Sequence, residues 1–333
     1  MTSRPDPRSL LQDLDLDKQQ LLDLLTLAAQ LKRDKQHGDE LPRLRGKNIV
    51  LVFEKNSTRT RCSFEVAAYD QGGQVTYLGP EWSHLGREES VADTARVLGR
   101  MFDCIALRGH AQDTLEQFAE HAGVPVWNAL TDVWHPTQSL ADVLTMTEHH
   151  GGDVEDIAFC FTGDGHSNIA RSLLVTGALL GMDVRVAAPA GLQPPPDVVA
   201  AAEAAARSSG ARLMVTDDLY PAVRGADFVY TDVWVSMGEP DDAWAARVRS
   251  LLPYRVTDDV PNASNRFGVR FMHCLPAIHN RGTVIGASLH QQFGLDGAEV
   301  AEEVFESKRS IVFGQAENRM HTIKALLVRA LAE

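Results

Sequence analysis

The sequence predicts an α/β protein of two domains, each a parallel sheet flanked by helices, with helices joining the two domains. Short apolar runs alternate with segments of helical spacing along most of the chain, which is typical of a parallel sheet covered by helices. The 333 residues exceed what one hydrophobic core usually serves. A break at Gly151-Gly152-Asp153 separates two alternating series. We therefore expect domains at 1–149 and 150–314, and a C-terminal helix at 315–333 that packs back on the first domain.

The first half is expected to open with a helix and to continue as alternating strands and helices. Asp17 can cap the first helix and Gly38 can end it, while its apolar face carries Leu21, Leu24, Leu25, Ala28 and Leu31. Runs of β-prone residues predict strands at 48–53, 74–78, 104–107 and 124–130. Helical spacing predicts helices that end near residue 69 and that span 91–101, 115–121 and 136–150.

The second half repeats this architecture. Apolar runs predict strands at 157–161, 184–188, 212–215, 228–233 and 269–274. Pro194-Pro195-Pro196 opens an alanine-rich helix, and Pro240-Asp241-Asp242 opens another that contains Trp244, Val248 and Leu251. Good helix formers from 315 to 331 predict the last helix.

The composition argues against several kinds of partner and site. A formal charge of -13 disfavours nucleic acid, because its partners usually carry a basic face. The sequence has no apolar leader and no run that is long and uncharged enough to cross a bilayer, so a soluble, cytoplasmic protein is expected. The cysteines are widely spaced and form no C-x-x-C pair, so neither a disulfide framework nor a zinc ribbon is indicated.

An anion site is predicted where the first strand feeds a helix, at Asn56-Ser57-Thr58-Arg59-Thr60-Arg61. The first N–H groups of a helix lack intrahelical partners and lie at the positive end of its dipole. Hydroxyl groups of Ser57, Thr58 and Thr60 add donors. Arg59 and Arg61 add guanidinium groups that can each hold two phosphate oxygens. The alternative is a helix capped by Ser57 with two solvated arginines.

Further polar residues follow other predicted strands, at the sheet edge where ligands bind in open α/β sheets. Arg108 follows one strand, and His135 and Gln138 share the first turn of a helix, where imidazole and amide can donate to a carbonyl oxygen. In the second half, Asp232 and Ser236 suit an ammonium group. Each residue alone has an ordinary structural explanation, but their joint placement at strand ends indicates a site.

Together these segments resemble the carbamoyltransferase family. Phe53 through Arg61 looks like its carbamoyl-phosphate loop, and His135-Pro136-Thr137-Gln138 looks like its carbonyl-binding turn. Three further segments are similar to those that separate the ornithine enzymes of the family from the aspartate enzymes: Asp232 through Gly238, His273-Cys274-Leu275-Pro276 and Gln315 through His321. The likeness runs from about residue 10 to the end, with the segments in family order.

The resemblance implies a role for each matching position. It implies that the phosphate is bound by Ser57, Thr58, Arg59, Thr60 and Arg108. It implies that the carbamoyl group is bound by His135, Gln138, Arg319 and the backbone around Cys274 and Leu275. It implies that ornithine is bound by Asn168, Asp232, Ser236 and Met237. The catalytic set that it implies is Arg108, His135, Asp232, Cys274 and Arg319.

The resemblance also implies a homotrimer with shared active sites, in which His84 reaches the site of a neighbouring subunit, and no organic cofactor or metal. Two positions depart from the family pattern. Ser167 stands where many relatives have asparagine, and His110 stands where many have an aromatic residue. We expect the change at Ser167 to have little effect, because the next position is the one that meets the substrate, and the change at His110 to affect loop packing more than chemistry.

The implied reaction is transfer of the carbamoyl group of carbamoyl phosphate to the side-chain amine of ornithine, which gives citrulline and phosphate. The proton acceptor stays open among Asp232, Cys274 and the substrate phosphate. Two other functions stay open: transfer to another amine such as putrescine, and a carbamoyl-phosphate sensor without turnover. The direction of the reaction and the size of the assembly, a trimer or larger, stay open as well. A nicotinamide-dependent oxidoreductase is disfavoured, because the Gly163 to Asn168 turn lacks the third glycine of a dinucleotide site.

Overall fold

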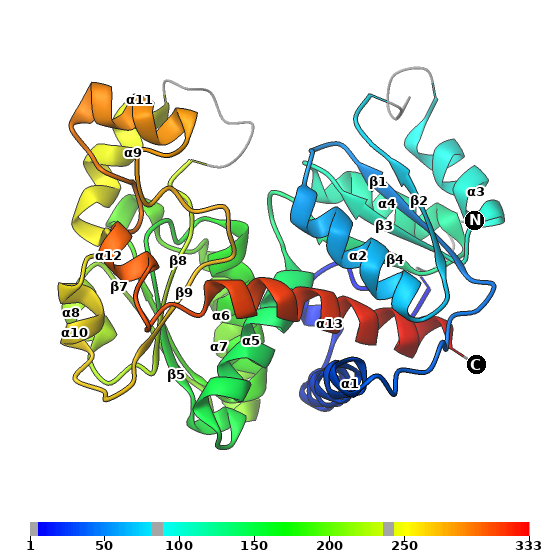
Figure 1. Cartoon of the computed structure of the whole chain (residues 1–333), viewed down its shortest axis with the longest axis horizontal. Helices are drawn as coiled ribbons and strands as arrows, with labels where there is room; N and C mark the ends of the chain where they lie inside the picture. Colours follow the sequence, from blue (N-terminus) through cyan, green and yellow to red (C-terminus); the bar gives the residue numbers. More distant parts are fainter. Residues whose placement is uncertain (1–5, 82–88, 236–242, 333) are drawn as a thin grey trace. The chain divides into compact units, whose positions relative to one another are not determined.

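The computed structural model describes residues 6–81, 89–235 and 243–332 (Figure 1). The chain divides into two compact units. The first comprises Met1–Leu144 and Glu317–Glu333, and the second comprises Thr145–Ala316. Two helices, α5 (Pro136–His150) and α13 (Val312–Leu331), contribute residues to both units. The domain boundaries expected at residues 149 and 314 stay predictions.

The first unit contains a four-stranded parallel sheet of order β2-β1-β3-β4. Its strands are β1 (Asn48–Phe53), β2 (Gln74–Leu78), β3 (Cys104–Arg108) and β4 (Val126–Leu130). Its helices, besides the two shared ones, are η1 (Asp13–Asp15), α1 (Lys18–His37), α2 (Thr58–Asp70), α3 (Val91–Met101) and α4 (Gln112–Ala122). The register of β1 and β3 pairs Phe53 with Arg108, so the loops after these strands start side by side.

Local sequence explains these elements well. The side chain of Asp17 caps α1 by accepting from the N–H of Gln20, and Gly38 ends α1 with a φ of 79°, as its sequence predicts. The five residues of the predicted apolar face are all buried. Ser57 caps α2 in the same way, because its Oγ accepts from the N–H of Thr60. The cap fixes where the loop after β1 becomes a helix.

The second unit contains a five-stranded parallel sheet of order β7-β6-β5-β8-β9. Its strands are β5 (Ala158–Thr162), β6 (Asp183–Ala187), β7 (Arg212–Thr216), β8 (Phe228–Thr231) and β9 (Arg270–Met272). Its longer helices are α6 (Asn168–Leu180), α7 (Pro196–Ser209), α9 (Ala243–Leu251) and α11 (Val284–Phe293). Short helices are η2 (Val154–Asp156), η3 (Ala190–Leu192), α8 (Leu219–Val223), η4 (Leu252–Tyr254), α10 (Asp259–Ala263) and α12 (Glu302–Phe305).

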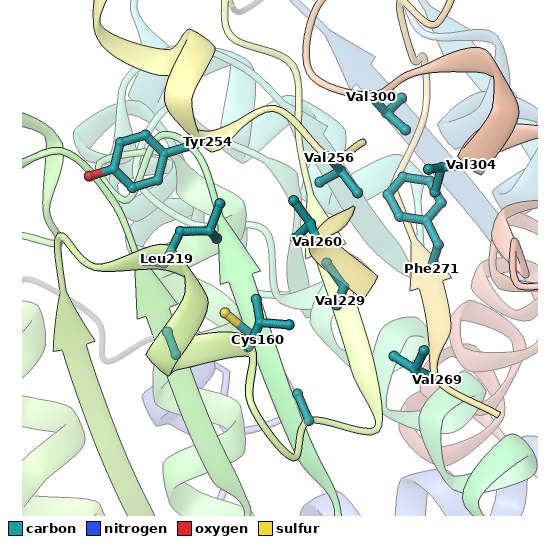
Figure 2. Close-up of a cluster of buried hydrophobic side chains, with 14 of the residues drawn as sticks. Cys160, Leu219, Val229, Tyr254, Val256, Val260, Val269, Phe271, Val300 and Val304 are labelled. Atoms are coloured by element: carbon teal, nitrogen blue, oxygen red, sulfur yellow. The ribbon is translucent and has the colours of Figure 1, made fainter. Parts of the chain in front are cut away.

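A buried apolar cluster covers one face of the second sheet (Figure 2). Cys160 of β5, Val229 of β8 and Phe271 of β9 pack there with Leu219 of α8 and Val260 of α10. This cluster fixes the sheet on which the polar loops of the second unit are mounted.

The fold class predicted from the sequence is confirmed, and the largest differences at the C-terminal ends of the strands are in β8 and β9. β8 ends at Thr231 and β9 at Met272, rather than at 233 and 274. Side chains replace the ladder beyond these points, because the N–H of Val233 donates to the Asp232 carboxylate and the N–H of His273 donates to Gln315.

Two further expectations concern the start of the helix after residue 240 and membrane spans. The expected start of a helix at Pro240-Asp241-Asp242 lies outside the described residues, although Trp244, Val248 and Leu251 are buried in α9. Across 6–81, 89–235 and 243–332, no helix has both the length and the apolar character that a membrane span requires.

Candidate functional site

The anion-binding candidates of the first unit meet at the Thr60 hydroxyl. Thr60 Oγ1 lies 3.0 Å from Ser57 Oγ, 2.8 Å from an Nη of Arg319 and 3.4 Å from an Nη of Arg108. Thr60, Arg108 and Arg319 are all at most 5% exposed. Burial strengthens the field of a charge because little water screens it. Two buried guanidinium groups therefore lie beside the first turn of α2, whose N–H groups also favour an anion.

The arginines of the predicted anion loop differ in their surroundings. Arg61 donates from Nε to Glu65 at 2.9 Å, and its guanidinium lies 4.1 Å from the centre of the Tyr77 ring. Its side chain is 46% exposed, so this arginine is held on the solvent side of α2. The expectation that Arg61 contributes to the anion loop is therefore replaced by a role in packing, while Thr58 and Arg59 stay candidates at the start of the helix.

His135 follows β4 and is 3% exposed. Its Nε2 lies 3.1 Å from an Nη of Arg319. Because a guanidinium can only donate, Nε2 accepts and Nδ1 carries the hydrogen, which faces Thr137 Oγ1 at 3.4 Å. Burial, and then the charges of Arg319 and Arg108, hold the pKa of His135 well below its ordinary value. The imidazole is therefore neutral.

Gln138 lies in the first turn of α5, where its backbone N–H donates to the His135 carbonyl at 2.9 Å. Its side-chain Nε2 donates to Asp142 Oδ1 at 2.8 Å. Sequence reasoning expected this amide to donate to a carbonyl oxygen, but Asp142 takes up the donating end. The amide oxygen is the end that remains for a ligand. Sequence reasoning missed Asp142, although a spacing of four residues on a helix was a usable signal.

The second unit brings Asp232 and Cys274 together at the ends of β8 and β9. The Cys274 thiol donates to Asp232 Oδ1 at 3.1 Å. Asp232 is 8% exposed, and burial raises the pKa of its carboxyl although His273, Cys274 and the N–H of Val233 oppose that rise. The structure thus joins the two residues that the sequence offered as candidate proton acceptors.

A buried imidazole organises the backbone after Cys274. His273 Nδ1 accepts from the N–H of Leu275 at 2.9 Å, and His273 Nε2 lies 3.3 Å from Glu299 Oε1. Both His273 and Glu299 are fully buried. Leu275 has a φ of 60°, a left-handed conformation that is unfavourable for a leucine and needs such support. Sequence reasoning missed Glu299, because nothing local ties it to a histidine so far back in the chain.

The same corner offers the three side chains that could hold a metal ion within the described residues: Asp232, His273 and Cys274, with ligand atoms within 4.8 Å of one another. Both nitrogens of His273 already face other groups, and the thiol donates to Asp232. A metal ion would have to displace these contacts. The expectation that the site holds no metal stays a prediction.

Of the remaining site candidates, Asn168 lies within the described residues, and three others do not. Asn168 is the first residue of α6, which Ser167 caps by accepting from the N–H of Ala170. The departure from the family pattern at Ser167 therefore supplies a helix cap. His84, Ser236 and Met237 lie outside the described residues.

Comparisons with known proteins agree across the chain. Residues 8–148 match the family model described as the carbamoyl-P binding domain of aspartate/ornithine carbamoyltransferase, and residues 155–330 match its Asp/Orn binding domain. Catabolic ornithine carbamoyltransferases of Burkholderia mallei and Burkholderia pseudomallei are each 55% identical over 326 residues, which is 97% of both chains.

Solved structures of ornithine carbamoyltransferases are similar to this chain over nearly its whole length. The ornithine carbamoyltransferase of Pyrococcus furiosus is similar with a TM-score of 0.89 and 37% identity, over 99% of this chain and 98% of that one. The enzyme of Gloeobacter violaceus is similar with a TM-score of 0.82 and 40% identity, over 99% of this chain and 100% of that one.

Proposed function

The chain belongs to the aspartate/ornithine carbamoyltransferase family, and we propose that it transfers the carbamoyl group of carbamoyl phosphate to the side-chain amine of L-ornithine. The products are L-citrulline and phosphate. The observation that carries the proposal is the convergence of Arg108 and Arg319 on Thr60 beside the start of α2. The names of the relatives at 55% identity support ornithine as the acceptor.

In the proposed mechanism the first unit holds the donor substrate. The N-terminus of α2, with Ser57, Thr58, Arg59 and Thr60, binds the phosphate, helped by Arg108. Charge that builds on the leaving phosphate is stabilised by groups that are already in place, which is usually the largest catalytic contribution. Arg319 donates to the carbonyl oxygen, where negative charge develops as the amine attacks. Neutral His135 accepts from Arg319 and so fixes its direction.

The second unit is proposed to hold ornithine through Asn168, Asp232, Ser236 and Met237. The side-chain amine must lose a proton to attack the carbonyl carbon. Asp232 is suited to take this proton because it is buried and already accepts a hydrogen bond from Cys274. The C–N bond then forms while the C–O bond to phosphate breaks, and Asp232, Cys274 and the phosphate remain the candidate proton acceptors.

Four wider features belong to the proposal. The relatives at 55% identity are named catabolic, which supports a catabolic role for this chain. We also propose a homotrimer in which His84 reaches a neighbouring site, and a cytoplasmic location. We propose the boundaries 1–149, 150–314 and 315–333 for the two substrate domains and the C-terminal helix.

The test is citrulline formation by the purified protein with carbamoyl phosphate and ornithine, with putrescine and aspartate as competing acceptors. Arg59→Ala should lower kcat/KM by about 100-fold or more, because it removes a charged donor to phosphate. Arg61→Ala is the matched control, since it removes an arginine two residues away that binds Glu65, and it should stay within a few fold of wild type. Turnover of another amine, or equal loss in both variants, would contradict the proposal.

A further inference from the structure

The side chains of Gln138 and Asp142 form a buried pair in the first two turns of α5. We propose that Asp142 is a positioning residue that turns the Gln138 amide so that its oxygen faces the substrate, and that this pair makes the site select a carbamoyl group over an acetyl group. The inference rests on the proposed function and adds a determinant of donor specificity to it.

Hydrogen-bond chemistry determines which end of the Gln138 amide faces Asp142. Gln138 is 1% exposed and Asp142 is fully buried, and the nitrogen of one lies 2.8 Å from an oxygen of the other. A carboxylate can only accept hydrogen bonds, so the end of the amide that faces it must be the NH₂ group. The amide oxygen of Gln138 therefore points away from Asp142.

The opposite end of the amide is an acceptor that no described residue satisfies. Gln138 Oε1 is buried and receives no hydrogen bond from the residues at 6–81, 89–235 and 243–332. A buried acceptor without a donor is unfavourable, so a ligand that brings an N–H group gains free energy there.

The surroundings of Gln138 define which ligand fits. His135 lies one helical turn before it, and His135 contacts Arg319, a donor suited to a carbonyl oxygen. A donor for C=O next to an acceptor for N–H matches the two ends of a carbamoyl group. An acetyl group presents the same C=O but has a methyl group in place of NH₂, so it leaves the Gln138 oxygen unsatisfied.

The experiment compares carbamoyl phosphate with acetyl phosphate, each with ornithine as acceptor. In the acetyl reaction the amine forms a bond to the acetyl carbon, the C–O bond to phosphate breaks, and one proton is released. Wild type should favour carbamoyl phosphate in kcat/KM. Asp142→Asn should reduce that preference about tenfold, because asparagine can accept from or donate to Gln138 and the amide is then free to turn. Its kcat/KM for acetyl phosphate should change less than about twofold.

Ser139→Ala is the matched control. It removes a different buried hydrogen bond of α5, the one to Asp13 at 2.6 Å, and leaves the amide orientation intact. It should lower both reactions in the same proportion, if it lowers them at all. An equal loss of both reactions in Asp142→Asn would assign Asp142 a structural role and overturn the proposal.

A second variant covers the case in which Asp142→Asn does not fold. Gln138→Leu then replaces it, and the same selective loss of activity with carbamoyl phosphate is expected.

A second measurement separates this inference from the proposed function. If wild type makes no citrulline, the proposed function fails. Thermal stabilisation by each phosphate then still tests the inference, because carbamoyl phosphate should raise the Tm more than acetyl phosphate does, and equal shifts would overturn it.

Discussion

Lys324 is a buried cation whose removal tests what holds the first unit together. Its side chain is fully buried on α13, and its ammonium group contacts Glu40 and, at 2.7 Å, Asp70 at the end of α2. Lys35 of α1 reaches the same Asp70 carboxylate at 2.5 Å, but its side chain is 36% exposed. The substitution Lys324→Met keeps the length of the side chain and removes its charge.

The magnitude follows from the contacts that are lost and kept. Hydrogen bonds between charged groups contribute about 1.5–3 kcal/mol each, and Lys324→Met loses two of them. Asp70 keeps Lys35, and Glu40 keeps the Gln71 amide at 2.9 Å, so neither carboxylate is stranded. Removal of the buried ammonium also relieves its desolvation penalty, which offsets part of the two lost bonds. We therefore expect the free energy of unfolding to fall by about 2 kcal/mol at pH 7, below the full cost of an isolated buried charge. Lys35→Met, which breaks a more exposed pair, should cost about 0.5 kcal/mol.

The effect should depend on pH with a definite sign. Burial raises the pKa of Asp70, but hydrogen bonds from Lys324 and Lys35 outweigh it and leave that pKa below its ordinary value. A carboxyl whose pKa is lowered in the folded state stabilises the fold above its unfolded pKa of about 3.9, and this contribution is lost as pH falls through the folded pKa. The deficit of Lys324→Met should thus be largest near neutral pH and shrink below about pH 4.

Urea unfolding at several pH values, followed by circular dichroism, measures both the deficit and its trend. Lys35→Met serves as control, since it removes the other cation from the same carboxylate. A Lys324→Met variant that is no less stable than Lys35→Met at pH 7 would contradict the stabilising role of Lys324. A deficit that stays constant as the carboxyls are protonated would contradict it as well.

Two further predictions concern the chemistry. Arg319→Ala should lower kcat about 100- to 1,000-fold, because it removes a preorganised donor, and steady-state kinetics with saturating substrates would measure this; a loss under tenfold would argue against a role at the carbonyl oxygen. Cys274→Ser should keep residual turnover with a raised KM for ornithine, since a hydroxyl can still donate to Asp232; complete loss of turnover in a folded variant would instead indicate a covalent role for the thiol.

The parts of the fold that could be predicted from the sequence are those determined by local patterns. The strand at 48–53, the helix at 91–101 and the cap at Asp17 depend on residues that are neighbours in the chain, and the structure confirms each of them. The expectation that polar groups at the carboxyl ends of neighbouring parallel strands come together is also confirmed. β1 and β3 are adjacent in the sheet, and Arg108 at the last position of β3 contacts Thr60 in the helix after β1.

Long-range pairs lay beyond this kind of reasoning. Lys324 and Asp70 are 254 residues apart, and His273 meets Glu299 across 26 positions with no periodic signal between them. The end of β9 was misjudged for the same reason, because the amide of Gln315, which lies 42 residues further on, takes the backbone N–H of His273 out of the sheet. Sequence patterns report which residues face a core, but they do not report which polar residue in a distant segment satisfies a buried group.

His135 connects the electrostatics of the first unit with its chemistry. Burial lowers the pKa of this histidine, and Arg319 and Arg108 lower it further, so both guanidinium groups exert a positive potential at the imidazole. The same potential acts on any anion beside Thr60, because that hydroxyl contacts both arginines. A charged histidine would add a third cation but would lose the lone pair that accepts from Arg319. A neutral imidazole therefore serves the site better, since it directs Arg319 without competing with it for negative charge.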